Sequence, residues 1–465
     1  MRPTVAPGGA PPWWLDDAFA AEGGRIDAQP LGEDVTADVA IVGGGYTGLW
    51  TALAVLERDP SADVVVLEAE FCGAGPSGRN GGFVEGYWPA LAELVELFGT
   101  ERAELLATAG EGIRPAIRAL GEDVWLREAG MLMVATTPAQ ERVLDHALAA
   151  AAAGRPEQAV ALTREEVGER CRSPRFRRGV LFPDTGTVHP GRLVRALRRT
   201  ALARGVRLYE GTPARAYARG RVTTPGGHVR AEQIVVATNA AMTDWRPVHG
   251  RLTVFGSYVV LTEPVPELLA EIGWTGGEAI VDARMFLHYF RTTEDGRVLM
   301  GSGSGPIGYA NRIDRRFTHD APTAARAELG LRRLLPGLAA ARIERSWGGP
   351  IDVSADHIPF VGTAPDGGIH FAAGFSGNGV GPSYLAGQAL ASLATGRDDE
   401  WRALPLVRAR GDRVPGEPLR YAGGTAVRQA ILACEEADEA GLRPPLPARA
   451  VAALPRLLGM RLGTR

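Results

Sequence analysis

The amino-acid sequence predicts an α/β fold, α+β over the whole chain, in which a parallel sheet is interrupted by a second, mostly antiparallel sheet. Three observations predict it. A strand, a glycine turn, a helix and a second strand follow one another within residues 37–70. From about 251 to 350 the chain changes to short or alternating apolar runs. A strand, a glycine loop and a helix return at 368–396, so the middle segment interrupts the first domain.

The composition favours a small molecule as partner. With 45% hydrophobic residues over 465 positions, the chain can bury a large core. A net charge of −3 with interspersed signs favours neither nucleic acid nor an anionic membrane as partner. All 51 basic residues are arginine, which excludes a lysine Schiff base.

The cysteines and the apolar runs indicate a cytoplasmic protein. Cys72, Cys171 and Cys434 are odd in number and form no Cys-x-x-Cys pair, so we expect neither a disulfide framework nor a structural metal site. No apolar run reaches the roughly 20 residues of a membrane helix, and we expect no membrane partner.

Residues 1–35 are predicted to form an N-terminal extension rather than a domain. They are rich in proline and glycine apart from "WWLDDAFAAE", which can form a short helix. Trp13 and Trp14 would pack this helix against the body of the protein.

The first strand and helix carry a dinucleotide-binding motif. "GGGYTG" places Gly43, Gly45 and Gly48 in the spacing G-x-G-x-x-G between the strand 37–42 and the helix 46–59. Gly43 permits the tight turn, Gly45 lets a pyrophosphate approach, and Gly48 lets the helix lie close to the strand. The alternative is an ordinary strand-to-helix turn without a ligand.

Glu68 strengthens the nucleotide hypothesis. It ends the second strand 20 residues after Gly48, where a carboxylate can accept hydrogen bonds from an adenosine ribose. The acid disfavours a 2′-phosphate, and therefore NADP. The same spacing recurs in "GSGPIG" (303–308), but no apolar helix follows, so we predict a loop there. The motif alone does not separate FAD from NAD.

The rest of the chain extends these patterns. We expect helices within 89–120, a strand at 130–137, a helix that ends at Gly205 and a strand at 230–240. In the inserted segment "EDG" predicts a hairpin turn. Residues 401–465 are predicted to form a C-terminal helical extension with a basic end.

A resemblance to a known family distinguishes FAD from NAD as the expected cofactor. The stretch from "ADVAIVGGGYTG" to "GAGPSGRNGGF" resembles the FAD-dependent oxidoreductases of the D-amino-acid oxidase superfamily, and within it the γ-glutamylputrescine oxidoreductase-like branch. That branch has "GASGRNGGF" after the second strand, and Pro76 replaces its alanine here. "HPGRLVRALRRTALARGVRLYEGTPA", "QIVVATNA", "WGGPIDVSADHIPFVG" and "GFSGNGVGPSYLAG" extend the resemblance over about 36–430.

The resemblance implies an FAD-binding domain assembled from 36–115, 160–250 and 350–400. The substrate domain would comprise 116–159 and 251–349, with its antiparallel sheet over the flavin. The implied FAD-binding residues are Gly43, Gly45, Tyr46, Thr47, Gly48, Glu68, Ala69, Ser77, Gly78, Arg79, Asn80, Gly81, Gly82, Phe83, Ala214, Ala237, Thr238, Gly374, Gly377, Asn378 and Gly379. In the loop 73–83, Gly78, Gly81 and Gly82 would make room for the isoalloxazine ring. Backbone N–H groups of 374–379 would reach its pyrimidine edge.

The reaction implied by the family is oxidation of a C–N bond, with hydride passing to flavin N5 and the imine hydrolysing to a carbonyl. We expect non-covalent FAD, because neither the loop 73–83 nor "SWGGPIDVS" offers the histidine or cysteine that some relatives use. Some relatives activate oxygen with a lysine near the position of Leu299. This chain would need Arg79, His288 or an electron acceptor other than O₂.

The substrate residues are less well marked. Relatives that oxidise amino acids hold the carboxylate with an arginine after "W-x-G", where this chain has Ile351 and then Asp352. Asp352 suits an amine substrate, or is a plain turn residue. Tyr258, Tyr289 and Trp347 are the other candidates for the pocket or for core packing. Adjacent strand residues face opposite ways, so His288 and Tyr289 cannot both line it.

Three functions remain open. The first is oxidation of a primary or secondary amine, including a γ-glutamylated polyamine. The second is an amino-acid or aminophosphonate oxidase in which an arginine such as Arg291 binds the anion. The third is a non-catalytic nucleotide-binding redox sensor.

Overall fold

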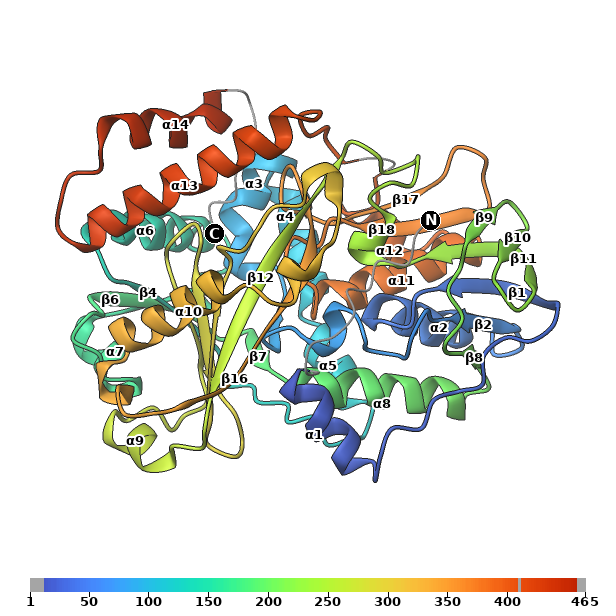
Figure 1. Cartoon of the computed structure of the whole chain (residues 1–465), viewed down its shortest axis with the longest axis horizontal. Coiled ribbons are helices and arrows are strands. Elements are labelled where there is room, and N and C mark those ends of the chain that lie inside the picture. Colours follow the sequence, from blue (N-terminus) through green and yellow to red (C-terminus); the bar gives the residue numbers. More distant parts are fainter. Residues whose placement is uncertain (1–11, 409–410, 458–465) are drawn as a thin grey trace.

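The protein folds around two large sheets that lie side by side. The structure is a computed structural model, and it describes residues 12–408 and 411–457. In Figure 1 the parallel-sheet domain lies on the right and the second sheet on the left. Helices from the C-terminal part lie along the top of the second domain. The predicted combination of a parallel and a mostly antiparallel sheet is confirmed.

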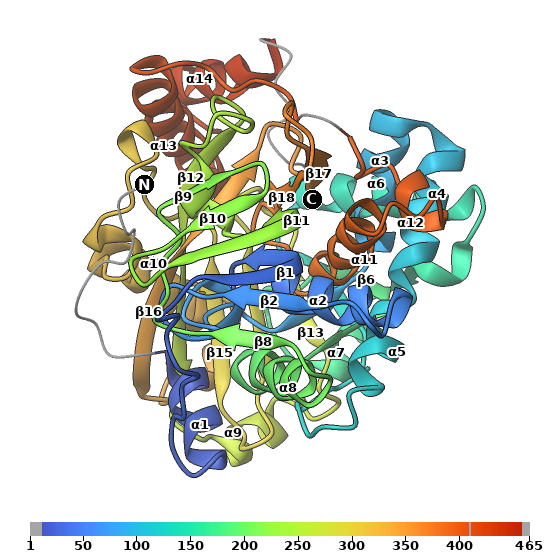
Figure 2. The same ribbon diagram turned by 90° about the vertical axis from the view of Figure 1, so that its right-hand side faces the viewer.

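The first sheet is parallel at its centre. β1 pairs in parallel with β2 on one side and with β11 on the other. β2 in turn pairs in parallel with β8, and β11 pairs in parallel with β18. Figure 2 shows β11, β1, β2 and β8 one below another. In spatial order the strands are β17 (Phe360–Thr363), β18 (Ile369–Ala373), β11 (His228–Val236), β1 (Val35–Val42), β2 (Val64–Leu67) and β8 (Arg207–Tyr209), with β10 (Arg221–Thr223) and β9 (Ala216–Ala218) attached to β11.

Helices pack on this sheet, whose central strands are apolar on both faces. All four residues of β2 are buried. The helices of this domain are α2 (Tyr46–Arg58), α3 (Leu91–Phe98), α4 (Thr100–Gly110), α5 (Ile113–Arg118), α8 (Pro190–Ala203) and α11 (Pro382–Ala394). α2 and α11 approach closely, since a Cβ on Gly387 would meet Trp50 Cβ at 2.7 Å.

The second sheet is antiparallel except where β13 pairs with β4. The predicted hairpin at "EDG" joins β14 to β15. In spatial order the strands are β16 (Ile343–Ser354), β12 (Leu252–Thr262), β15 (Val298–Ser302), β14 (His288–Thr292), β13 (Ala279–Asp282), β4 (Met131–Ala135), β6 (Arg178–Phe182) and β5 (Val160–Leu162). Its helices are α6 (Pro138–Ala152), α7 (Arg164–Arg170), α9 (Pro266–Glu271) and α10 (Ala321–Leu334).

The two faces of the second sheet pack against different parts of the molecule. Val260, Phe290 and Met300 share a core with Leu331 of α10. The alternate residues Val259, Leu299 and Trp347 pack instead with Trp13 and Trp14. The N-terminal segment therefore covers the face that lies toward the first domain.

Shorter elements complete the fold. α1 (Trp13–Ala21) confirms the helix predicted in the N-terminal extension. β3 (Phe83–Glu85) pairs with β7 (Thr185–Thr187). The C-terminal part contains α12 (Glu400–Ala403), α13 (Leu419–Glu439) and α14 (Leu446–Leu457). Glu435 of α13 accepts hydrogen bonds from Arg284 and from Met285 N, which fixes α13 to the second domain.

One predicted domain boundary is wrong in the structure. The sequence places 160–250 in the first domain, but β5 and β6 pair with each other and with β4 of the second sheet. Their apolar residues join the second domain's cores, as Val180 does beside Met133. Two parts of the predicted extensions lie outside the described residues. They are residues 1–11 of the N-terminal extension and the basic end, residues 458–465, of the C-terminal extension.

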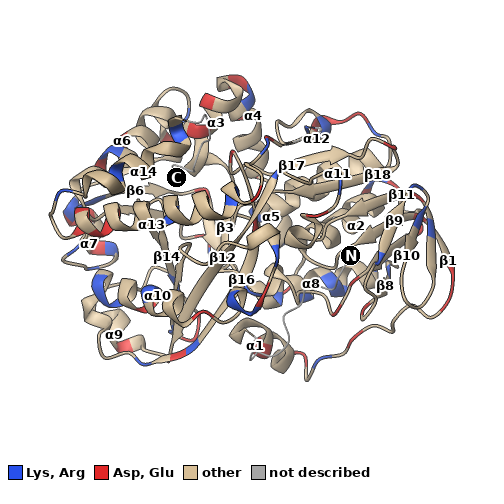
Figure 3. Ribbon diagram, turned by 45° about the horizontal axis from the view of Figure 1, so that its top comes forward, with Lys and Arg blue, Asp and Glu red and all other residues tan. Residues whose placement is uncertain are grey.

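The surface mixes charges of both signs, and Figure 3 shows them scattered over both domains. Within residues 12–408 and 411–457, no helix combines the length and hydropathy that a bilayer crossing requires. The same part of the chain holds no cluster of three His, Cys, Asp or Glu residues suited to a metal. All three cysteines are free thiols.

Candidate active site

A deep cavity runs along the first sheet and reaches the edge of the second. Its volume is about 580 Å³, within the range of roughly 300–1,000 Å³ that small-molecule sites occupy. It begins at the carboxyl ends of β1, β2 and β11, where ligands of open α/β sheets bind. The predicted residues that line it are Gly43, Gly45, Tyr46, Thr47, Glu68, Ala69, Ser77, Arg79, Asn80, Ala214, Ala237, Thr238, Asp352, Gly377 and Gly379.

The turn between β1 and α2 has the geometry that the glycine motif predicts. Gly43 has φ +115°, and a Cβ there would meet the Ala237 carbonyl oxygen at 2.4 Å. A Cβ on Gly48 would lie 1.9 Å from the Gly43 oxygen. Gly48 therefore lies behind the turn rather than in the cavity wall, and its role is the close approach of helix and strand.

Glu68 lies where the ribose hypothesis needs an acid. Its carboxylate accepts hydrogen bonds from Gly44 N at 2.7 Å and Glu70 N at 3.0 Å. Burial raises the pKa of Glu68 above its usual value, while these two N–H donors oppose the rise. The carboxylate is thus held by backbone at the cavity wall, ready to accept from a ligand hydroxyl.

The loop 73–83 lines the cavity with residues 73–77 and with Arg79 and Asn80. Ser77 Oγ accepts a hydrogen bond from Tyr46 N at 3.0 Å and ties the loop to α2 through the short helix η1 (Pro76–Gly78). Asn80 Oδ1 accepts from Gly82 N at 2.7 Å. The Arg79 Nε donates to the Ala74 oxygen at 2.9 Å, and burial lowers the pKa of Arg79.

The glycines of this loop have a different role from the predicted one. A Cβ on Gly78 would meet Leu15 Cδ2 at 2.7 Å, and one on Gly81 would meet the Tyr289 ring at 2.9 Å. A Cβ on Gly82, at φ +77°, would meet the Val188 oxygen at 2.2 Å. Gly78, Gly81 and Gly82 make room for protein atoms behind the loop, so the explanation from the flavin ring is wrong for these three positions.

Asp352 anchors the loop that precedes α11. Its Oδ2 accepts from Gly374 N at 2.6 Å, and its Oδ1 accepts from Phe375 N at 3.2 Å and Asn239 Nδ2 at 2.7 Å. Burial raises its pKa to about 7, against the lowering effect of the Gly374 N–H. The N–H of Gly374 is used here, so the prediction that it reaches a flavin edge is wrong.

The remaining predicted residues lie behind the cavity wall. Phe83 packs edge-on against Tyr289, with ring centroids 5.6 Å apart. Asn378 donates its backbone N–H to the Phe375 oxygen at 3.0 Å. Trp347 donates Nε1–H to the Arg79 oxygen at 2.8 Å, so it supports the loop from outside. Of the two alternatives for Trp347, the structure shows core packing, and Trp347 does not line the cavity.

Tyr258 and Tyr289 lie on opposite faces of the second sheet. The Tyr289 hydroxyl is 2.9 Å from Ser257 Oγ, and its ring packs on Gly81 of the loop. Tyr258 follows Ser257 in β12 and therefore points to the opposite face of the sheet. Its hydroxyl donates a hydrogen bond to the Arg316 oxygen on the α10 side. The prediction that Tyr258 lines the pocket is wrong, because strand residues alternate between faces.

His288 is also directed away from the cavity. Its ring packs beside Gly330 of α10, and its Nδ1 lies 2.7 Å from Asp282 Oδ2. His288 therefore cannot serve as a group beside the cofactor. Of the two residues considered for the reaction with oxygen, Arg79 and His288, Arg79 borders the cavity.

Several wall residues were not predicted. Pro213 and Pro225 line the end near Ala214, while Asn239, Ile313 and Thr318 line the end near the second sheet. Ile313 and Thr318 come from the loop between β15 and α10, after the "GSGPIG" stretch that was predicted to be a loop, and no motif marks these two positions. Asn239 follows the predicted Thr238 directly, and its φ of +47° marks a special turn that the sequence "ATNA" does not reveal.

The wall fits a dinucleotide cofactor. The first turn of α2 directs backbone N–H groups and the positive end of its dipole at the cavity, as a pyrophosphate site requires. Thr238 Oγ1 and Asn239 Oδ1 are buried there without a hydrogen-bond partner in the part of the chain described. Buried polar atoms without a protein partner at a cavity wall fit a site in which a ligand supplies the partner.

Comparison with known proteins identifies this cofactor. The model of the family described as "FAD dependent oxidoreductase" (DAO) matches residues 38–393. The chain belongs to this family. Its cofactor is therefore FAD, and the predicted D-amino-acid oxidase superfamily is confirmed.

Curated relatives agree with the predicted branch. The probable oxidoreductase OrdL of Rhizobium meliloti is 30% identical over 412 residues, covering 85% of this chain and 90% of the relative. The γ-glutamylputrescine oxidoreductase of Escherichia coli is 30% identical over 410 residues, covering 84% and 92%. Among solved structures, glycine oxidase from Geobacillus kaustophilus has a TM-score of 0.67 at 24% identity and covers 82% of this chain and 100% of that chain. The last similarity shows the fold.

Proposed function

We propose that this FAD-dependent oxidoreductase oxidises the C–N bond of an amine to an imine, which water hydrolyses to a carbonyl compound. Bound FAD would supply the acceptor for the hydride that leaves the carbon beside the nitrogen. The chain would contribute orientation and exclusion of water rather than a set of acid and base residues. Similarity to the E. coli γ-glutamylputrescine oxidoreductase supports an amine substrate.

The observation that carries this proposal is the apolar wall at the cavity end beside the second sheet. Pro350, Ile351 and Phe375 line it together with Ile313. In the relatives that bind a substrate carboxylate, an arginine occupies the position that we assign to Ile351. An apolar wall favours an amine whose nitrogen is neutral and whose neighbouring carbon bears no carboxylate.

The amino-acid oxidase alternative loses its proposed anion-binding residue. Arg291 is fully buried and donates hydrogen bonds to the carbonyl oxygens of Thr292, Gly82 and Val188. Burial lowers its pKa to about 9. Its guanidinium lies over the Trp14 ring at 5.7 Å, so it faces α1 rather than the cavity.

Asp352 has a structural role in this proposal. All of its carboxylate hydrogen bonds described above come from protein donors, so it holds the loop 374–376 instead of binding a cationic amine. The substrate would be recognised by the shape of the apolar wall and by Arg79 and Asn239 at its border. A γ-glutamylated polyamine, with a distant carboxylate, fits this combination.

We infer that FAD binds without a covalent bond. Among the described residues, those that line the cavity include no histidine or cysteine. Cys72 is buried, and its Sγ packs behind Gly44. Acid denaturation followed by filtration should release all of the flavin, and flavin that stays with the polypeptide would contradict this inference.

Anaerobic bleaching of the flavin tests the proposed reaction. The panel comprises putrescine, γ-glutamylputrescine, glycine, D-alanine and 2-aminoethylphosphonate, each mixed with the holoenzyme without oxygen. We expect loss of the oxidised-flavin absorbance with putrescine and γ-glutamylputrescine. Bleaching by glycine or D-alanine alone would favour the amino-acid oxidase, and no bleaching by any amine would favour the redox-sensor hypothesis. Air admitted afterwards distinguishes O₂ from another electron acceptor.

A further inference from the structure

The N-terminal segment before β1 touches the loops of the cofactor cavity at both of its ends. We call residues 12–34 the N-terminal strap. The family match begins at residue 38, so the strap lies outside it. Only α1 gives the strap regular structure, yet Trp14, Leu15, Ala18 and Leu31 are buried.

The first end of the strap supports the loop 73–83. Leu15 fills the space beside Gly78, where a Cβ would approach its side chain to 2.7 Å. The Trp14 ring packs edge-on against Trp347, with centroids 6.4 Å apart. Since Trp347 holds the Arg79 carbonyl, α1 and the second sheet together fix the back of a loop whose front lines the cavity.

The other end of the strap supports the nucleotide-ribose side. Leu31 N donates a hydrogen bond to Thr212 Oγ1 at 3.0 Å, and Thr212 N donates to the Glu68 carbonyl oxygen at 2.8 Å. The Leu31 oxygen lies where a Cβ on Gly226 would be, at 1.8 Å. The neighbouring residue Pro225 lines the cavity, so the strap abuts two of its walls.

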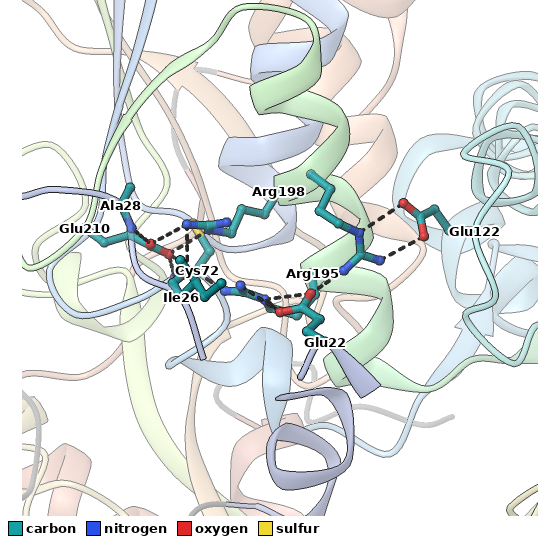
Figure 4. Close-up of polar contacts among 9 residues, drawn as sticks. Glu22, Ile26, Ala28, Cys72, Glu122, Arg195, Arg198 and Glu210 are labelled. Carbon is teal, nitrogen blue, oxygen red and sulfur yellow. Dashed lines mark hydrogen bonds and ion pairs between the residues drawn. The ribbon is translucent and has the colours of Figure 1, made fainter. Parts of the chain in front are cut away.

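Glu210 joins the middle of the strap to the loop after β2. Its carboxylate accepts from Ala28 N at 2.5 Å, from Cys72 N at 2.7 Å, and from Arg198 Nε at 3.1 Å and Nη2 at 2.8 Å. Arg198 also donates to the Ile26 oxygen at 3.1 Å. Figure 4 shows Glu210 and Arg198 pointing toward each other beside Ala28 and Cys72. Charge-assisted bonds of this kind are among the stronger ones in proteins.

A second ion-pair group holds the end of α1. Glu22 accepts from Arg195 Nε at 2.9 Å and pairs with Arg199, which also pairs with Glu122 at 2.9 Å. Arg195, Arg198 and Arg199 all belong to α8. Figure 4 shows the Glu22 carboxylate beside Arg195. Arg195 is 2% exposed, so this contact is well shielded from water.

We propose that the N-terminal strap is part of the FAD site and determines how tightly FAD is held. Glu210 and Glu22 are positioning residues in this proposal. They hold the strap on α8, and the strap in turn holds the loops that carry Glu68 and Arg79. Because those loops line the cavity that would hold FAD, ordering of the strap and binding of FAD would stabilise each other. This proposal rests on FAD binding and is independent of the substrate.

A purely structural role for these contacts would give a different result. It would destabilise the protein with and without FAD by similar amounts. The proposed coupling requires that the FAD-induced rise in melting temperature itself becomes smaller. It also requires that FAD slows amide hydrogen exchange in the strap, at Ala28 and Leu31.

The experiment compares Glu210→Gln and Glu22→Gln with Asp27→Asn in the full chain stripped of flavin. Asp27 belongs to the strap, but its ion pair with Arg25 is exposed, which makes it a matched control. FAD affinity is measured from flavin fluorescence, and melting is followed with and without FAD. We expect each glutamine variant to weaken FAD binding by about tenfold or more, since a charge-assisted bond exceeds that free energy, and the control to match the parent.

Two results would overturn the proposal. One is FAD affinity within about twofold of the parent in both glutamine variants, which is below the free energy of one hydrogen bond. The other is a parent protein whose strap exchanges at the same rate with and without FAD. If Glu210→Gln does not fold, Glu22→Gln and the exchange experiment on the parent still decide. If no amine in the substrate panel bleaches the flavin, FAD affinity and hydrogen exchange in the strap can still be measured. Failure of the proposed reaction can therefore be told apart from failure of this proposal.

Discussion

The two ends of the cavity are built in different ways. At the nucleotide end the wall includes Gly43 and Gly45, which have no side chain, and the first turn of α2, beside the Glu68 carboxylate. At the second sheet the wall is made of side chains such as Ile313, Ile351 and Phe375. Backbone groups fit a ligand shared by a family, whereas side chains can change with the substrate.

This difference teaches where substitutions should act. At Gly43, and at Gly48 behind it, a side chain has no space, so even one methyl group changes the turn before α2. At the second sheet a side chain can be exchanged within the same backbone, so the expected effect is a change of substrate. The predictions below test that division, beginning with the largest expected effect.

Gly48→Ala should strongly weaken FAD binding. The new Cβ would lie 1.9 Å from the Gly43 oxygen, so α2 must move away from β1 and take its N–H groups out of position. Overpacking of this kind costs about 1–3 kcal/mol, and we expect the FAD dissociation constant to rise by roughly a hundredfold. Titration of the apoprotein with FAD measures it.

Gly423→Ala is the matched control for this prediction. Gly423 also lies inside a helix, α13, and a Cβ there would meet nothing within 4 Å. It should leave FAD binding unchanged. Equal losses in both variants would mean that the contact at Gly48 is not the cause.

The same division explains what could be predicted from the sequence. Gly43, Gly45 and Glu68 were found because a local spacing defines a turn and the acid that follows it. Tyr258 was misplaced because its face depends on the register of β12 with β16, where it pairs with Gly348. Ile313 and Thr318 were missed because the loop between β15 and α10 reaches the cavity only through the tertiary fold.

Gly78, Gly81 and Gly82 show an intermediate case. The sequence correctly indicates close contacts of the loop, since three glycines fall within five residues. It does not say on which side the contact lies. Only the positions of Leu15, Tyr289 and Val188 show that the crowded side is the protein and not the cavity.

Ile351→Arg should change the substrate rather than the cofactor. The arginine would bring a cation into the apolar wall, where a carboxylate can pair with it. We expect kcat/KM for glycine or D-alanine to rise about tenfold or more relative to γ-glutamylputrescine, while FAD affinity changes little. Ile351→Met controls for size alone. A loss of FAD with no change in relative preference would contradict the proposed place of Ile351.

Asp352→Asn should remove a pH dependence of stability. The folded-state pKa of about 7 lies above the ordinary value of 3.8, so the neutral acid stabilises the fold below pH 4, and that stability is lost as pH rises through 7. The parent should lose on the order of 2–4 kcal/mol of unfolding free energy over this window from this group. Urea unfolding at pH 5 and pH 8 measures the difference.

The slope with pH, rather than the absolute stability, is the readout for Asp352. The substitution also replaces one acceptor oxygen by an NH2 donor, which then faces the N–H donors that Asp352 contacts, and this lowers stability at every pH. Asp366→Asn, in the exposed turn before β18, should keep the slope of the parent. A slope unchanged in Asp352→Asn would mean that the Gly374 and Phe375 N–H groups keep the carboxylate ionised.

Tyr258→Phe should have the smallest effect, although Tyr258 was a candidate for the substrate pocket. Its hydroxyl donates to the Arg316 oxygen in the short helix η6 (Arg315–Phe317), and the adjoining residues Ile313 and Thr318 line the cavity. One lost hydrogen bond, about 1 kcal/mol, acts only through that loop, so we expect KM to change by less than about threefold. FAD affinity should not change. A larger rise in KM with unchanged FAD affinity would show that this single bond positions the loop carrying Ile313 and Thr318. The wall near the second sheet would then depend on distant contacts, as we propose for the nucleotide end and the strap.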